Sequence, residues 1–529
     1  MVYRWNVAKT SEKIQRSTWI TLAILGSTIL ITMYGETMLL PAMGDIISDF
    51  NISYSTSSWI LTSYLIAGAV MTPIAGKLSD IYGKKKLVLI VFVIYIVGIV
   101  LGGLSNNIYL LLASRVIQGM GISMFPIAFG IIRDQFPLQK LAIGVGIFSS
   151  MFAAGSVVGI SLGGSIIQNF GWRSTFFTII PVAIILWVII RKYVQNDDIA
   201  KSGLERNGRS SFVQNTDIIH DSMGQHHPTD SKRVANNYKP NIDFKGAVTL
   251  AITITSFLLT LTYFANTTNG TNTNSIDSNH AFIILVSLAM LTTISMASFI
   301  VVERKAQSPL IPLNLIADKI LLPTNIILLV FGVTMFMVYQ TIPILVTSPS
   351  PLGFGGDAMD SAYIQLPFMI VFLLFAPSSG FIVSKIGNFK PIIAGSITTT
   401  VGFFVLSAFH STVPMVAINL VMISAGLSLI NVGAFNVVLQ YTPRQFSGIS
   451  IGISVVIVLI GSSIGPVIAS IYMQTYQEFV GGFGDRLYPS PLSYNLIFLT
   501  ATLISTISVV TVIFLKRRTA TQIAAVKKK

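Results

Sequence analysis

Two ionisable side chains stand inside long apolar runs of the sequence, where a charge is costly. Glu36 lies in the run over residues 18–40, and Arg115 lies in the run over 107–131. A carboxyl group at membrane depth usually faces a cavity or a partner, so it marks an ion or proton pathway by default. Glu36 is therefore a candidate proton-coupling group. The alternative is that it lies near the outer interface and is simply solvated.

Arg115 cannot discharge itself by losing a proton. At 1.5 Å per residue, its depth and that of Glu36 differ by roughly 5 Å, within the reach of two side chains. We hypothesise that the two residues are neighbours and that Arg115 controls the proton affinity of Glu36. The alternative is a structural arginine that donates hydrogen bonds to helix carbonyl groups.

The loop over residues 76–86, between two apolar runs, contains residues that could form a gate. Gly76 and Gly83 flank Asp80 and permit a tight turn. Asp80 could cap the following helix or pair with a facing cation when a gate closes. Lys84 and Lys85 belong to the same loop motif, although the simpler reading of the basic run over 84–86 is an orientation signal, which we favour.

Small residues form a stripe in the run over residues 141–163. Gly155, Gly159 and Gly163 recur every four residues, so they share one helix face and let a neighbouring helix approach closely. We expect this stripe to lie between two halves of the molecule, as a seal or a pivot, although a plain packing stripe has the same spacing. The complete motif is Gly146, Gly155, Gly159, Gly163 and Gly164.

Polar, aromatic and thioether side chains inside the apolar runs could line a cavity for an amphipathic ligand, because methionine and aromatic groups can repack around varied shapes. Most side chains of this kind serve helix packing instead. The candidates are Tyr34, Met38, Gln118, Met335, Phe336, Tyr339, Gln340, Gln365, Asn431 and Asn436.

The composition explains why these few polar groups matter. Of 529 residues, 52% are hydrophobic and only 10% are charged, with a mean hydropathy of +0.74. A soluble domain carries about 25% charged residues, so the chain is a polytopic α-helical membrane protein. The absence of cysteine excludes disulfides, thiolate metal sites and a cysteine nucleophile. The fourteen predicted spans are 18–40, 57–76, 87–104, 107–131, 141–163, 174–190, 246–265, 280–302, 320–344, 361–384, 391–409, 413–437, 447–472 and 492–515.

The net charge of +14 reports orientation rather than a nucleic-acid partner. With the N-terminus inside, every Lys and Arg falls in cytoplasmic segments except Arg115, Arg173 and Arg486. Basic residues accumulate on that side of a membrane. An even number of spans then brings both termini to the cytoplasm.

The two ends of the chain repeat. Gly452, Gly461 and Gly465, followed by Pro466, have the spacing of Gly146, Gly155 and Gly159 at an offset of 306 residues. Gly76 and Gly83 match Gly380 and Gly387 at an offset of 304. Duplicated six-helix halves are typical of transporters with a site between the halves. The predicted segments are a cytoplasmic N-terminus (1–17), a first half (18–192), a polar cytoplasmic linker (193–245), two inserted helices (246–302), a second half (303–516) and a basic cytoplasmic tail (517–529).

At these motifs the chain resembles the major facilitator superfamily, and within it the fourteen-span drug:proton antiporters. The resemblance rests on the loop over 76–86, the stretch over 112–121 with Arg115, the glycine motif over 146–164 and the stretch over 171–177. Two departures bear on export. Ile160 stands where the antiporter motif normally has proline, and the in-span acid is Glu36 rather than a residue at position 32.

The resemblance implies a major facilitator fold and a proton-coupled efflux transporter for small amphipathic or drug-like compounds. Its expected partners are a small-molecule substrate, protons and the lipid bilayer of the plasma membrane, with no nucleic acid and no cofactor, and we expect a monomer driven by the proton gradient. An importer or facilitator of the same fold is the alternative. A membrane-embedded enzyme or sensor is more remote, because all five histidines fall in loops or at span ends.

Overall fold

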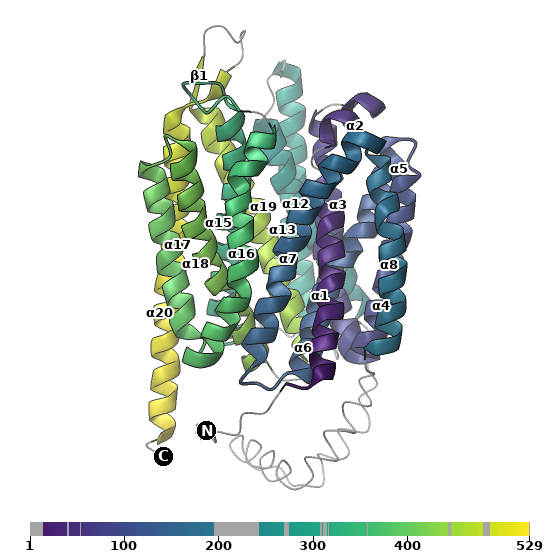
Figure 1. Ribbon diagram of the computed structural model, residues 1–529, viewed down its shortest axis with the longest axis vertical. Helices are drawn as coiled ribbons and strands as arrows, with labels where there is room; N and C mark the ends of the chain where they lie inside the picture. Colours follow the sequence, from purple (N-terminus) through teal and green to yellow (C-terminus); the bar gives the residue numbers. More distant parts are fainter. Residues whose placement is uncertain are drawn as a thin grey trace.

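The computed structural model describes residues 14–39, 42–52, 54–194, 243–268, 275–306, 317–356, 358–442, 446–479 and 487–527, together with residues 309 and 315. Nearly all of these residues are helical, and the helices run side by side in one bundle (Figure 1). The predicted polar linker lies almost entirely outside the described residues, as does most of the predicted N-terminal segment.

The first group of helices is called the first half below. Its elements are α1 (Arg16–Thr37), α2 (Met43–Phe50), α3 (Tyr54–Tyr82), α4 (Lys84–Gly103), α5 (Ile108–Gly119), the 3-10 turn η1 (Met120–Ser123), α6 (Met124–Gln135), α7 (Leu141–Phe170) and α8 (Arg173–Tyr193). The turns that separate the long helices use glycine where the backbone is left-handed. Gly83 has φ +94° between α3 and α4, and Gly171 has φ +77° between α7 and α8.

The remaining helices form an inserted pair and the second half. The inserted pair is α12 (Phe244–Thr268) and α13 (Ser275–Lys305). The second half comprises α15 (Leu321–Thr347), α16 (Ala358–Ile386), α17 (Phe389–Ala408), α18 (Val413–Tyr441), α19 (Ser447–Thr475), the two-stranded hairpin β1 (Gln477–Phe479) and β2 (Leu487–Pro489), and α20 (Pro491–Lys527). The strands are antiparallel, with Glu478 opposite Tyr488.

Thirteen helical segments in the described part of the chain are long and apolar enough to cross a bilayer. One of them, Ile108–Gln135, combines α5, η1 and α6. The remaining predicted span coincides with α12, whose apolar stretch Lys245–Leu261 is shorter. Each of the fourteen predicted apolar runs is thus helical, and a multi-pass helical membrane protein is what the structure shows.

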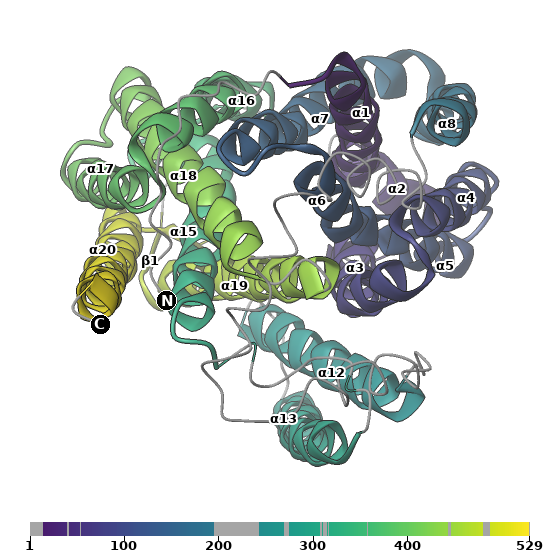
Figure 2. The same cartoon turned by 90° about the horizontal axis from the view of Figure 1, so that it is seen from below.

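The two halves meet along two seams, which Figure 2 shows from one end of the bundle. Helix α7 packs against α16, and α3 packs against α19. Helix α12 lies outside the second seam and contacts both α3 and α19, and α13 packs on α12. Ala69 of α3, Leu250 of α12 and Ile453 of α19 share one buried apolar cluster. The inserted pair therefore contacts both halves at one seam.

The glycine stripe does not lie where we expected it. An added Cβ on Gly155 would stand 2.4 Å from the carbonyl oxygen of Leu30, and one on Gly163 would stand 2.8 Å from that of Met38. Leu30 belongs to α1 and Met38 directly follows it, while Gly159 lies against Tyr34 and Thr37 of the same helix. The stripe thus packs two helices of the same half, and the expected seam between halves is wrong for these three residues. The reason is that the part of α7 that carries this stripe contacts α1, whereas an earlier part of the helix contacts the other half.

The residue of the motif that does lie between halves is Gly146. A Cβ there would stand 2.4 Å from the carbonyl oxygen of Ala376 in α16. The second half repeats both contacts. Gly461 lies against Leu329 of α15 within its own half, and Gly452 lies against Pro73 of α3 in the other half.

Two elements were not predicted. The short helix α2 follows α1, and the hairpin β1–β2 follows α19, both in segments without an apolar run. In addition, α1 ends at Thr37 rather than near residue 40, so Glu36 is the penultimate residue of its helix instead of lying about five residues from the end.

Candidate functional site

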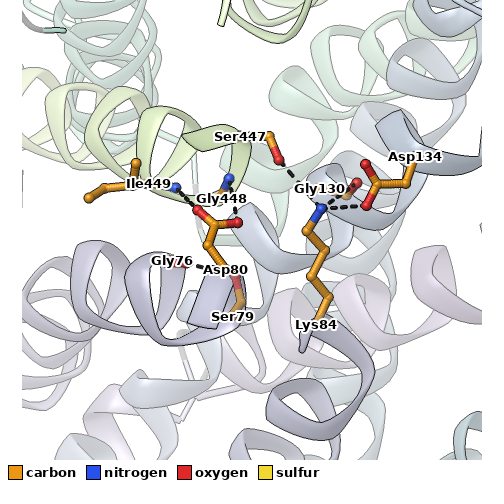
Figure 3. Close-up of polar contacts among 9 residues, drawn as sticks. All are labelled: Gly76, Ser79, Asp80, Lys84, Gly130, Asp134, Ser447, Gly448 and Ile449. Carbon is orange, nitrogen blue, oxygen red and sulfur yellow. Dashed lines mark hydrogen bonds and ion pairs between the residues drawn. The ribbon is translucent and has the colours of Figure 1, made fainter. Parts of the chain in front are cut away.

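Polar contacts of Asp80, Lys84 and Arg133, together called the latch below, lie at the end of the bundle where α1 begins and α20 ends (Figure 1). Figure 3 shows the contacts of Asp80 and Lys84. Asp80, in the last turn of α3, accepts hydrogen bonds from the backbone N–H groups of Gly448 (3.3 Å) and Ile449 (3.2 Å). These groups stand at the start of α19, where the helix dipole favours a negative charge. Asp80 therefore caps a helix of the opposite half, rather than the helix that follows it.

Glycines allow this close approach. A Cβ on Gly76 would stand 2.7 Å from the carbonyl oxygen of Gly448, and one on Gly448 would stand 2.8 Å from that of Gly76. Backbone groups do not move aside cheaply, so any side chain at either position would push the halves apart. The Gly76 and Asp80 of the loop motif thus act at one contact between α3 and α19.

Lys84 is the second charged group of the latch. Its Nζ lies 2.5 Å from a carboxylate oxygen of Asp134 in α6, 3.3 Å from the carbonyl oxygen of Gly130 and 3.4 Å from the hydroxyl of Ser447. The side chain is buried. This residue is accordingly more than the orientation signal that we favoured, because it ties α4 to α6 and reaches the first residue of α19. Lys85 is half-buried and Lys86 is exposed.

A further cation crosses between the halves nearby. Arg133 of α6 is buried and donates a hydrogen bond from Nη2 to the carbonyl oxygen of Thr442, directly after α18. The carbonyl groups at a helix C-terminus favour a cation. Acid at a helix start and base at a helix end therefore hold the halves together, and both contacts can break and reform without covalent change.

Arg115 lies in a buried network nearer the other end of the bundle. Its guanidinium donates to the carbonyl oxygens of Gly35 (2.8 Å), Glu36 (3.2 Å) and Ile60 (3.3 Å), and to the side-chain oxygen of Gln118 (3.1 Å). The side chain is fully buried. Among the described residues no ion pair joins it to the Glu36 carboxylate. Arg115 and Glu36 are neighbours, but their hydrogen bond goes to the backbone.

The Glu36 side chain is half-buried beside this network. The residue's own backbone carbonyl oxygen accepts the hydrogen bond from Arg115. The hydroxyl group of Tyr64 donates to the carbonyl oxygen of Thr32, and that of Tyr95 donates to Ile31. The carboxyl group thus stands at the end of α1, beside the buried Arg115 network.

The remaining predicted cavity residues have diverse surroundings. Gln118 uses both ends of its amide, because Nε2 also donates to the carbonyl oxygen of Gly98. The ring of Tyr339 lies 5.5 Å from that of Phe336 and 5.8 Å from that of Phe368. Asn436 donates to Asn388 in a contact of the second half. Tyr34, Met38, Met335 and Asn431 are buried, Gln365 is half-buried and Gln340 is exposed. Their contact with substrate stays a prediction.

A third polar cluster fixes α2 to the start of α8, at the opposite end from the latch. Asp49 accepts hydrogen bonds from Trp172 Nε1 (2.8 Å) and Arg173 Nη1 (3.1 Å). The Trp172 hydrogen bond, with further help from Arg173, holds the pKa of Asp49 below its usual value. Arg173 also stacks on the Trp172 ring at 4.1 Å. The sequence motif over 171–177 therefore organises an outer corner of the bundle.

Sequence reasoning missed several partners at these sites. Asp134 and Arg133 lie beyond the predicted end of their span at residue 131, because α6 continues to Gln135. The repeat itself contained a usable signal. Asp134 and Gln440 are 306 residues apart, and Lys84 and Asn388 are 304 apart, so equivalent polar pairs occur in both halves. In the second half Asn388 donates to Gln440 at 2.7 Å.

Comparison with known proteins gives these contacts a context. The family model described as Major Facilitator Superfamily matches residues 25–368 and 359–529. Multidrug resistance protein 3 of Bacillus subtilis (strain 168) is 26% identical over 79% of the chain and 72% of that protein. The tetracenomycin C resistance and export protein of Streptomyces glaucescens is 25% identical over 86% of the chain and 76% of that protein.

Solved structures agree on the fold. The human organic anion transporter MFSD10 (TETRAN) matches with a TM-score of 0.59 at 12% identity, over 93% of the chain and all of that structure. The proton:xylose symporter XylE matches with the same TM-score and identity, over 93% of the chain and 95% of that structure. At this identity the likeness concerns the architecture alone.

Proposed function

The chain belongs to the major facilitator superfamily, and from this premise we propose that it exports small amphipathic, drug-like compounds from the cell in exchange for protons. Relatives named for multidrug resistance and for tetracenomycin C export support the direction of transport. The single observation that carries the coupling is the position of Glu36 in the last turn of α1, where its backbone carbonyl oxygen accepts a hydrogen bond from the buried guanidinium of Arg115 at 3.2 Å.

In this proposal the protein has fourteen spans and both termini in the cytoplasm, so the latch faces the cytoplasm and the conformation described is closed on that side. The net placement of Lys and Arg supports that orientation. It acts as a monomer in the plasma membrane and needs no cofactor, since the proton gradient supplies the driving force.

Alternating access follows from the contacts between the halves. The Asp80 cap on α19 and the Arg133 contact after α18 break when the cytoplasmic side opens, and they reform when it closes. Protonation of Glu36 favours one state and bound substrate favours the other. A ligand shifts such an equilibrium only by its difference in affinity between the two states, so substrate and proton compete through the conformations they favour.

Arg115 contributes a fixed positive charge beside Glu36. Because its hydrogen bonds go to carbonyl groups of α1 and α3, it stays in place whether or not the carboxyl group is protonated. In this proposal Arg115 controls the proton affinity of Glu36 through this charge, without forming an ion pair with it.

Everted membrane vesicles test this proposal. When respiration acidifies the lumen, adding a transported drug should release protons in vesicles that contain the protein and not in vesicles from cells that lack it. An importer or facilitator of the same fold is the competing function, which Ile160 in place of the motif proline leaves open. Drug movement that is indifferent to the proton gradient would overturn the antiport proposal.

A further inference from the structure

Two phenylalanine rings meet between the halves, above the latch. Phe129 of α6 and Phe435 of α18 are stacked, with ring centroids 5.2 Å apart and planes at 15°. Both side chains are almost completely buried, at 2% and 6% exposure. One ring comes from each half, so this contact must break whenever α6 and α18 separate.

The two residues are equivalent in the repeat. They are 306 residues apart, the same offset that relates Gly146 to Gly452. In an arrangement with two-fold symmetry, a residue can touch its own counterpart only at the axis that relates the two copies. The stacked rings therefore mark the axis between the halves, where a path through the molecule has to run.

Each ring is carried by a helix that is anchored one residue away. Gly130, next to Phe129, accepts a hydrogen bond from Lys84, and Asn436, next to Phe435, donates one to Asn388 at 2.7 Å. The anchors are themselves equivalent in the repeat, but only the one in the first half is charged. These two polar contacts, one within each half, thus hold both helices in the position that stacks the rings.

The ring of Phe129 is also supported from within its own half. Phe148 of α7 packs edge-on against it at 4.7 Å, and Phe125 packs edge-on against Phe148 at 5.8 Å. Phe129 is therefore held in place by its own half, and the ring of Phe435 moves away from it when the second half moves.

We propose that Phe129 and Phe435 form an apolar gate on the axis, which closes the space between the halves from the latch side. Polar contacts such as those of the latch hold helices together, but polar groups attract water rather than exclude it. An apolar constriction does exclude it, because narrow apolar passages empty of water. The gate prevents protons from leaking past the halves while the latch is closed, and its rings separate once in each transport cycle.

The test measures passive proton leak in reconstituted vesicles, with an internal pH dye, an imposed pH gradient and no substrate. Phe129→Ser/Phe435→Ser should raise the leak at least about tenfold over the unmodified protein. Phe129→Leu/Phe435→Leu, which keeps an apolar contact, should leave it unchanged. The matched control is Phe176→Ser/Phe403→Ser, which removes two equally buried rings carried by α8 and α17, at the periphery of the bundle (Figure 2).

An unchanged leak in the serine pair would overturn the proposal, and so would an equal leak in the control pair. If the serine pair cannot be purified as a folded protein, Phe435→Ser alone provides the same readout, because Phe129 keeps its seat on Phe148, and it should raise the leak at least about threefold. An unchanged leak in that variant contradicts the gate as well. The measurement needs neither a known substrate nor proton coupling, so its failure and that of the proposed function can be told apart.

Discussion

The hydrogen bonds of Arg115 explain how a charge can be kept inside an apolar bundle. Its guanidinium contacts three backbone carbonyl groups and one amide oxygen, which satisfies a group that cannot lose its proton. Lysine could not span these acceptors, because it has a single nitrogen in place of a planar fork. The residue therefore joins α5 to α1 and α3.

Asp80 is predicted to hold the latch through its charge. Asp80→Asn keeps the shape but removes the negative charge at the start of α19, an interaction worth about 0.3–2 kcal/mol. The open state should gain in population by about two- to thirtyfold. The measurement is maleimide labelling of a single Ser447→Cys, which is selective because the natural chain has no cysteine. Faster labelling is expected with Asp80→Asn and not with Glu478→Gln on the exposed strand β1, and equal rates would contradict the role of the latch.

Asp49 gives a pH-dependent contribution to stability. Its pKa in the folded protein is below the unfolded value of about 3.9, so the stabilisation is present above that value and is lost as the pH falls through the folded pKa. Because the side chain is 45% exposed, the effect is at most about 1 kcal/mol. Thermal unfolding of the protein and of Asp49→Asn should differ at pH 7 and converge toward pH 3. A difference that stays constant with pH would exclude this interaction as its source.

The glycines of α7 and α19 serve two separate structural roles. Gly155 and Gly461 let each helix pack against the first helix of its own half, while Gly146 and Gly452 face the other half. The same faces are used in both repeats, so a rigid half can move against its partner without disturbing its own internal packing. This division supports movement at the seams rather than within the halves.

These two roles predict different labelling rates for two alanine variants. Gly146→Ala and Gly155→Ala each bring a Cβ to 2.4 Å from a backbone oxygen, so each should lose about 1–3 kcal/mol of stability. Only Gly146→Ala should also speed labelling of Ser447→Cys, since only that clash forces the halves apart. If Gly155→Ala opens the latch equally well, the two glycines do not differ in the way that we infer.

The elements themselves were largely predictable from hydropathy, and the contacts between them were not. Apolar runs identified each long helix because every backbone group in a bilayer must be hydrogen-bonded within its own helix. Spacing placed Gly155 and Gly159 on one face but could not say which helix that face would meet. The partner of Lys84, Asp134, lies fifty residues further on, and hydropathy has no information about such pairs.

At the scale of the whole molecule, the inserted pair makes the two seams different. Helix α12 covers the seam between α3 and α19, which also carries the Asp80 contact. Both seams are closed by backbone contacts, at Gly76 and Gly448 in this one and at Gly146 and Gly380 in the other. An internal repeat therefore does not imply equal motion at both seams. The second-half counterpart of the charged latch pair Lys84 and Asp134 consists of the neutral amides Asn388 and Gln440.

The central claim is that the carboxyl group of Glu36 couples protons to export, and reconstituted vesicles with an imposed pH gradient test it directly. Export by the unmodified protein should rise with the gradient. Glu36→Gln should lose that dependence and at least about 90% of uphill transport, while it still exchanges substrate down a concentration gradient, and Glu478→Gln should behave as the unmodified protein. Gradient-driven export that persists in full in Glu36→Gln would contradict the account.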